Sequence, residues 1–335
     1  MRRIVSCVLS IILAFMVVAP MTSCGETHSA QFAGEDAVVK NFVDERFEFM
    51  GLVFRLAGFP YVSEIRSNYH RRLDSTFSCF RGHETISAIS NFENFASFIS
   101  FASILEITDD GFALRDWDSY RSDMQLHFDR NWLLSFVNKL NDLHRESNFR
   151  DFFNNDENQR HFMRLSTDFV QNVYRNINFE WFEQFGLESG NMHVILTPSL
   201  TNWAFAQTIY DEDFNLKIAY AVLGSENRNL TTTIHEFAHS FGDTMAAQWF
   251  SSCLDFWSLT RETLQRGSVH SIYATSRMVA NDYVARALTI LYMLDNTNQR
   301  LASMLQRERN RGFGNIEEVF DMLARYLGRY ELIQS

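Results

Sequence analysis

Five residues in the second half of the chain, His235-Glu236-Phe237-Ala238-His239, narrow the range of structures open to it. Apolar side chains lie before, between and after the two histidines, which favours a buried helix. In a helix, residues four positions apart lie on one face with their Cβ atoms about 5–6 Å apart. Both imidazoles can therefore reach one metal ion, and we predict that His235 and His239 are metal ligands. Gly242 is expected to open the turn that follows this helix.

Glu236 lies next to the first histidine and points to the side of the expected metal. This position suits a general base better than a third ligand. The spacing indicates zinc, which binds imidazole and lowers the pKa of a bound water towards about 7. We therefore predict that Glu236 takes the proton as the hydroxide attacks a carbonyl group. The alternative is a buried helix in which both histidines are only hydrogen-bonded.

A third zinc ligand must come from elsewhere in the chain. The longer spacing His-Glu-x-x-His-x-x-Gly-x-x-His ends on Met245, which cannot bind zinc in that role. Asp243 lies too close along the same helix. The further candidates downstream are Glu262, His270 and Asp282.

Asp282 is the preferred third ligand. It lies in segment 278–294, which has a helical pattern. The pair Asn281-Asp282 resembles the Asn-Glu pair by which gluzincins place their third ligand on a second helix. Because aspartate is shorter by one methylene, the helix must approach more closely or the site is weaker. Arg286, four residues on, can orient the carboxylate. The alternative is an Asp–Arg pair on the surface of a helix.

The first residues have the pattern of a secretory signal. Arg2-Arg3 precedes an apolar run at residues 4–19, which is short for a membrane-spanning helix of about 20 residues. A basic pair followed by a short apolar run is typical of a cleaved signal peptide. We assign residues 1–23 to this signal.

The end of the signal, Met21-Thr22-Ser23-Cys24, resembles the bacterial lipobox, with Met21 at a position that is usually leucine. The resemblance implies a lipid on Cys24 that anchors the protein to the outer or cytoplasmic membrane of the cell envelope, facing away from the cytoplasm. Residues 24–35 are polar and rich in small residues, as expected of a tether. The alternative is an ordinary signal peptide with a chance cysteine.

The charge of the chain argues against one class of partner. The formal net charge is −11, and the sequence contains no block of Lys or Arg. Such a chain repels phosphate groups, so we expect no nucleic-acid partner. The low number of prolines, 3 in 335 residues, favours long helices over many turns.

The spacing of apolar residues divides the mature chain into two parts. Residues 36–185 have apolar residues at three- and four-residue intervals, which predicts a helical part. Its later helices are expected near residues 84–107, 119–143 and 160–181. After Gly190 the pattern predicts strands at residues 192–197, 203–210 and 216–223. We therefore predict a mostly helical α+β fold, in which residues 186–335 form a zincin-like catalytic part with a small mixed or antiparallel sheet.

Other features are interpreted as structural. Cys79 and Cys253 lack metal-site spacing. They can pair outside the cytoplasm, but we interpret them as small buried apolar residues. An aromatic stripe is expected to lie in the core; its members are Phe80, Phe92, Phe95, Phe98 and Phe101.

Several segments resemble one family. Segments 43–49 and 54–58 resemble the opening of an uncharacterised family of secreted bacterial proteins and lipoproteins with a gluzincin-type zinc-peptidase site. Segments 235–241, 281–287 and 311–313 resemble its later motifs. The resemblance covers nearly the whole mature chain and implies a gluzincin-like hydrolase.

Together these features predict a membrane-anchored, extracytoplasmic zinc metallopeptidase that hydrolyses peptide or protein substrates. His235, His239 and Asp282 are the expected ligands of Zn²⁺, and Glu236 is the expected base. Two alternatives stay open: a zinc-dependent amidase on a non-peptide substrate, and a non-catalytic binding lipoprotein with a degenerate metal site. The candidates for stabilising the tetrahedral intermediate are Tyr283, Arg286 and His270.

Overall fold

Helix α1 (Glu45–Leu56) lies at the centre of the first half of the chain and is buried on almost every side. Asp44 caps its start by accepting a hydrogen bond from a backbone N–H of the first turn. Gly58, with a φ of 79°, follows its end. Gly51 allows close packing, because a Cβ there would lie 2.9 Å from the backbone nitrogen of Leu200.

The computed structural model describes residues 42–90, 100–121, 129–200, 203–213, 215–224, 227–252, 254–266, 275–329 and 332. Asn41–Ser335 form one compact unit. The signal peptide, Cys24 and the tether lie outside the described residues, and so do His270 and Cys253. The predictions for these residues stay predictions.

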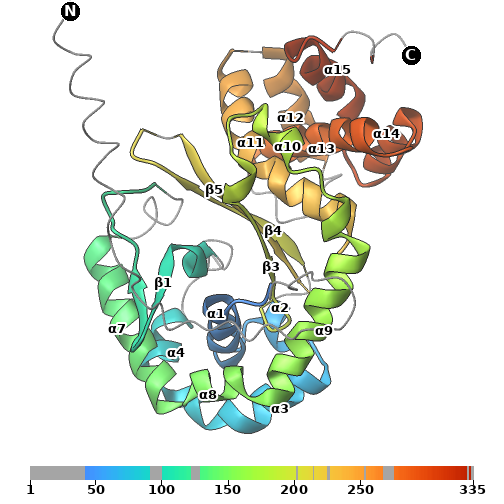
Figure 1. The fold of residues 1–335 in the computed structure, drawn as a ribbon. Helices are drawn as coiled ribbons and strands as arrows, with labels where there is room; N and C mark the ends of the chain where they lie inside the picture. Colours follow the sequence, from blue (N-terminus) through green and yellow to red (C-terminus); the bar gives the residue numbers. More distant parts are fainter. Residues whose placement is uncertain are drawn as a thin grey trace, which may run out of the picture. The chain divides into compact units, whose positions relative to one another are not determined.

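Helices α3, α4 and α8 lie around α1 (Figure 1). The helices of the first half besides α1 are α2 (Pro60–Ser63), α3 (Asn68–Phe77), α4 (Glu84–Ile89), α7 (Arg130–Glu146), α8 (Phe149–Asn154), α9 (Asp156–Asn172) and α10 (Glu180–Glu183). Aromatic rings fill the space between them; Phe49, for example, contacts Phe149 and Phe112. Within the predicted aromatic stripe, Phe101 is buried and Phe80 packs against the core, while the other three rings lie outside the described residues.

A β-hairpin interrupts the predicted helical part. Strands β1 (Leu105–Thr108) and β2 (Gly111–Leu114) pair antiparallel through a two-residue turn, so the prediction of helix up to residue 107 is wrong. Asn141 of α7 holds the hairpin, since its side chain donates to the Phe112 carbonyl and accepts from the Phe112 N–H, both at 2.8 Å. The two turn residues, Asp109 and Asp110, lie directly before Gly111, and such a sequence is typical of a tight hairpin turn.

The second half contains a three-stranded mixed sheet of order β3-β5-β4. Its strands are β3 (Met192–Leu196), β4 (Ala204–Tyr210) and β5 (Leu216–Leu223). β5 pairs parallel with β3 and antiparallel with β4. The three predicted strands are present, and the prediction of a mostly helical α+β fold with a small mixed sheet is confirmed. β4 lies at an edge of this sheet.

Helices follow the sheet to the end of the chain. They are α11 (Leu230–Ser252), α12 (Leu254–Arg266), α13 (Ser276–Asn296), α14 (Leu301–Asn310) and α15 (Ile316–Tyr326). α11 packs against β4, β5 and α13. It continues ten residues past Gly242, so the prediction of a turn after that glycine is wrong. A glycine within a helix costs only about 1 kcal/mol relative to alanine, which packing can outweigh.

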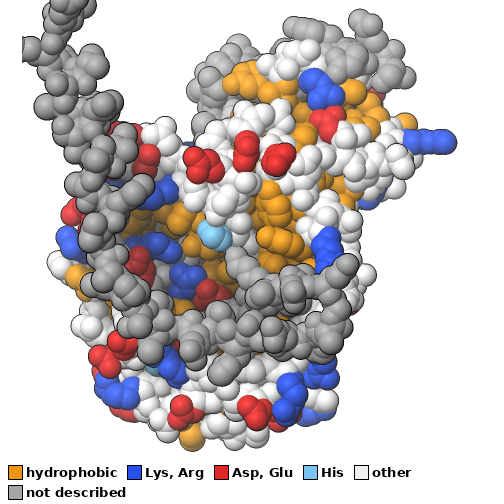
Figure 2. Space-filling model, viewed as in Figure 1, with side chains coloured by type: hydrophobic (Ala, Val, Ile, Leu, Met, Phe, Trp, Pro, Cys, Tyr) orange, Lys and Arg blue, Asp and Glu red, His pale blue; other side chains and the backbone are white. Residues whose placement is uncertain are grey.

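Two surface features concern the predicted partners. None of the described helices combines the length and the hydropathy needed to cross a membrane. On the face shown in Figure 2, acidic and basic side chains are interspersed around a hollow that contains apolar and basic side chains.

Cys79 is exposed and forms no disulfide with any described residue, so the prediction that it is buried is wrong.

Glu48 is a buried acid of α1, far in the sequence from the histidine motif. Its carboxyl group accepts hydrogen bonds from the Tyr69 hydroxyl at 2.8 Å and from the Ser199 backbone N–H at 3.2 Å. Burial raises the pKa of Glu48 from 4.5 to about 7, because the charged form loses its hydration. The folded protein therefore favours the protonated form of this side chain.

Glu48→Gln should change how stability depends on pH. The raised pKa stabilises the native protein below about pH 4.5, and this contribution is lost as the pH rises through about 7. Glutamine does not ionise; its oxygen can accept from the Ser199 N–H, and its NH2 group can donate to the Tyr69 hydroxyl oxygen. We compare the free energy of unfolding of the variant with that of the unchanged protein. From pH 4.5 to pH 8, this difference is expected to shift by about 3 kcal/mol in favour of the variant. Urea unfolding across this range, with the exposed Glu188→Gln as control, measures it; parallel pH profiles for Glu48→Gln and the unchanged protein would contradict the expectation.

Candidate metal centre

The two motif histidines lie one turn apart on α11. Asn229 caps this helix, since its side chain accepts a hydrogen bond from the Thr232 N–H at 3.0 Å. The Nε2 atoms of His235 and His239 lie 3.2 Å apart. Both rings are partly exposed. The helix therefore brings the two ring nitrogens to one point, as the i, i+4 spacing predicts.

Helix α13 brings Asp282 to the same point. Its Oδ1 lies 3.2 Å from Nε2 of His235 and 3.5 Å from Nε2 of His239. With bonds of about 2.0–2.1 Å, two ligand atoms of a tetrahedral zinc ion lie roughly 3.3 Å apart. The three distances match this value. His235, His239 and Asp282 form a group that can hold a metal ion.

The short aspartate reaches the histidines because α11 and α13 approach closely at Gly242. A Cβ on this residue would lie 3.1 Å from Oδ1 of Asn281 and 3.4 Å from the backbone nitrogen of Ala285. The 3.1 Å contact is tighter than nine in ten that Cβ atoms make, and the 3.4 Å contact is an ordinary van der Waals contact. From the sequence we expected either a close approach of the two helices or a weaker site, and in the structure the aspartate reaches both histidines.

The protonation states of two donors suit metal binding. Burial lowers the pKa of His235 from 6.5 to about 4, although the hydrogen bond to Asp282 opposes this shift. Burial alone would raise the pKa of Asp282, but the charge of Arg286 and the neighbouring imidazoles hold it well below its ordinary value. At neutral pH the group thus contains a neutral imidazole and a carboxylate, which are the forms that bind metals.

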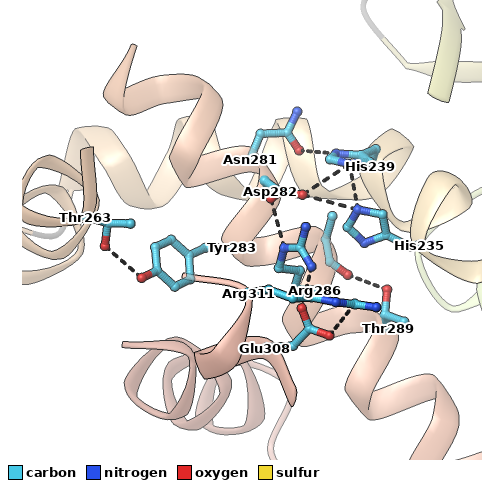
Figure 3. A network of polar contacts seen from close by, with 11 residues as sticks. His235, His239, Thr263, Asn281, Asp282, Tyr283, Arg286, Thr289, Glu308 and Arg311 are labelled. Carbon is cyan, nitrogen blue, oxygen red and sulfur yellow. Dashed lines mark hydrogen bonds and ion pairs between the residues drawn. The ribbon is translucent and has the colours of Figure 1, made fainter. Parts of the chain in front are cut away.

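Polar neighbours fix the orientation of two donors (Figure 3). Oδ1 of Asn281 lies 3.2 Å from Nδ1 of His239, and in this pairing the ring donates through Nδ1 and keeps Nε2 for the metal. Nε of Arg286 donates to Oδ2 of Asp282 at 2.9 Å, which leaves Oδ1 towards the histidines. The predicted Asp282–Arg286 pair is present, but Asp282 is 2% exposed and the pair is not a surface one.

Arg286 is itself held by residues from the end of the chain. Its guanidinium group pairs with Glu308 of α14 and lies 4.0 Å from the ring centre of Phe313. Glu308 also accepts a hydrogen bond from Arg311 at 2.7 Å. Sequence reasoning missed Glu308, and it noted Phe313 only as part of a motif resemblance. The alternation of arginine with a single acid at 307–311 is the signal that could have suggested a buried ion pair.

Glu236 is buried beside the donor group and lines the same cavity. Burial raises the pKa of its carboxyl group from 4.5 to about 7. The cavity, which we call the metal-site cavity, has a volume of about 520 Å³. One wall is β4, from Ala204 to Thr208, and the opposite wall contains the three donors, Asn281 and Arg286. A buried acid, the donor group and a strand edge therefore share one open space.

The remaining predicted site residues differ in whether they reach the metal-site cavity. Tyr283 is fully buried and points away from the histidines, and its hydroxyl lies 2.8 Å from that of Thr263 (Figure 3). It is therefore not placed to stabilise a tetrahedral intermediate. Glu262 of α12 is not part of the donor group. His270 lies outside the described residues, and Arg286 lines the metal-site cavity.

Comparison with known proteins gives no match: no family model, curated protein or solved structure is significantly similar to this chain. The inferences that follow rest on the residues and their geometry.

Proposed function

We propose that this chain is a zinc-dependent metallopeptidase. The observation that carries the proposal is the donor group, in which His235, His239 and Asp282 present three atoms at 3.2–3.5 Å from one another. Two imidazoles and one carboxylate are a donor set typical of catalytic zinc. When bound, zinc supplies a Lewis acid that polarises the carbonyl group of the cleaved bond and acidifies a water molecule.

The protein's own groups supply the remaining parts of the reaction. Glu236 follows a ligand directly in the sequence and lines the metal-site cavity, so its carboxylate is placed to accept a proton. Arg286 keeps Asp282 oriented and charged. Its guanidinium group also lines the cavity. Of the three predicted candidates for stabilising negative charge on the substrate, it is the one that the described residues place there.

The substrate class follows from the strand in the cavity wall. β4 is an edge strand, and among the described residues only Arg121, at Tyr210, pairs with its backbone on the side away from β5. An extended peptide can add to such an edge through main-chain hydrogen bonds. This favours a peptide over a small non-peptide amide, which has no repeated backbone groups to pair with the strand.

Metal removal tests this proposal. The purified protein should contain about one zinc ion per chain and cleave members of a mixed peptide pool. A chelator should abolish cleavage, and added zinc should restore it. Metal analysis and mass spectrometry of the pool measure both properties. A protein that takes up no zinc and cleaves nothing would favour the binding lipoprotein, whereas cleavage of cell-wall fragments alone would favour the amidase.

We also propose that the enzyme is anchored in the cell envelope through Cys24. The proposal rests on the signal pattern and the lipobox-like residues before this cysteine. Cys24→Ala should leave the protein unprocessed or release it from membranes, because stable anchoring needs the acyl chains. Membrane fractionation and the mass of the mature N-terminus measure this. A Cys24→Ala protein that is processed and anchored as before would contradict the proposal.

A further inference from the structure

A second cavity adjoins the metal-site cavity on the other side of His235. It has a volume of about 280 Å³, enough for one amino-acid side chain but not for a large ligand. Four residues line both cavities: Asn227, Thr232, His235 and Arg286. A group that enters the second cavity therefore lies next to the donor group.

The charges around this second cavity are unbalanced. Its lining contains Arg286, Arg307 and Arg311 but one acid, Glu308. Glu308 is shared, because it pairs with both Arg286 and Arg311. Arg307 donates to the neutral amide oxygen of Gln299 at 2.9 Å. Arg286 also pairs with Asp282 behind the lining, so three guanidinium groups face two carboxylates and an excess of one positive charge remains.

The start of α11 adds to this positive potential. Asn229, Thr231 and Thr232, which form the cap and first turn of this 23-residue helix, line the same cavity. The N-terminus of a helix carries a partial positive charge from its backbone N–H groups. The lining also contains uncharged polar groups, including Gln299 and Thr231. These groups can hydrogen-bond an anion without adding charge.

We propose that this second cavity, the basic pocket, binds a carboxylate of the substrate next to the cleaved bond. This inference rests on the proposed function of the metal centre. The carboxylate can belong to a Glu or Asp side chain or to the free end of the peptide. Because Glu308 already occupies the pocket, a singly charged carboxylate fits it better than a doubly charged phosphate. Arg311, whose side chain is 52% exposed, lies at the surface, where it can attract the anion.

Binding and cleavage of matched peptides test the basic pocket. One series carries Glu, Gln or phosphoserine beside the cleaved bond, and a second carries a free or an amidated C-terminus. Binding is measured by fluorescence anisotropy with the Glu236→Gln protein, and cleavage with the unchanged protein. We expect the protein to bind and cleave the Glu peptide in preference to the Gln peptide, or the free C-terminus in preference to the amide. The preference should be about 10- to 100-fold, the usual range for a charge-assisted hydrogen bond. The series that shows the preference identifies the source of the carboxylate.

Variants of α14 connect the preference to the pocket. Arg307→Gln combined with Arg311→Gln should abolish it, while Arg307→Lys should retain most of it. Arg309→Gln is the matched control, since Arg309 lies on the same helix and pairs with Glu317 outside the lining. Thermal unfolding of each variant checks that the fold persists.

The outcomes separate this inference from the proposed function. Cleavage without any preference for a carboxylate would overturn the basic pocket and leave the peptidase intact. Preferential binding that the double variant abolishes, without cleavage by the unchanged protein, would support the pocket and contradict the peptidase. Stronger binding of phosphoserine than of Glu, or an equal loss of preference in Arg309→Gln, would overturn the pocket.

Discussion

Glu236→Gln is expected to retain zinc and to lose about 10²–10⁴ in turnover, the usual contribution of a positioned acid–base group. Glutamine has nearly the same shape, and Glu236 is not a member of the donor group, so metal binding should not change. The amide cannot accept the proton that the carboxylate takes. Substrate binding should survive, because the carboxylate is needed chiefly in the transition state.

The matched comparisons are His235→Ala and Glu262→Gln. His235→Ala should lose zinc and activity together, because it removes a donor. Glu262 lies on α12 outside the donor group, so its substitution should leave both unchanged. Zinc content is measured by mass spectrometry beside steady-state hydrolysis of one peptide from the cleaved pool. Undiminished turnover by a zinc-loaded Glu236→Gln protein would remove the proposed base.

Asp282→Ala is expected to weaken zinc binding by more than about 100-fold. Loss of a residue that only orients a ligand typically costs 10- to 100-fold in metal affinity, and Asp282 is placed as a ligand itself. The fold should persist, since Arg286 keeps its pairing with Glu308. Competition with a fluorescent chelator measures the affinity. Full zinc binding by Asp282→Ala, together with its loss in His270→Ala or Glu262→Ala, would move the third ligand to that residue.

For Asp282→Glu, the sequence and the structure lead to different expectations of the zinc affinity. Glutamate is the residue that gluzincins have at the resembling position, so the sequence alone allows tighter binding. In the structure, Oδ1 of Asp282 already lies 3.2 Å and 3.5 Å from the two Nε2 atoms, so a side chain longer by one methylene places its oxygen beyond the position that shares a metal with them. We therefore expect Asp282→Glu to bind zinc less tightly than the unchanged protein.

The features that sequence reasoning predicted are local ones. Two histidines four residues apart come together in any helix that contains them. The strands at 192–223 were likewise predicted from residues that are close in the sequence. Asp282 was reached through a motif resemblance. Its partner Arg286 was found because the two lie on adjacent turns of one helix.

The features that it missed depend on contacts between distant segments. The hairpin at 105–114 is held by Asn141, and Glu308 reaches Arg286 from another helix. No local pattern encodes such contacts. Gly242 was misread for the same reason: a helix-ending glycine and a helix-packing glycine look alike in sequence, and only the neighbouring helix distinguishes them.

The close approach at Gly242 links two positions that are forty residues apart in the chain. The separation of the helix axes determines how long a carboxylate must be to meet the histidines. A Cβ at position 242 would lie 3.1 Å from Oδ1 of Asn281, so a larger residue there requires this side chain or α13 to shift by a few tenths of an ångström. A longer carboxylate at position 282 can compensate for an outward shift of α13. In this chain the size of residue 242 and the length of the carboxylate at position 282 are thus expected to depend on each other, so that Asp282→Glu should be better tolerated in a Gly242→Ala protein than in the unchanged one.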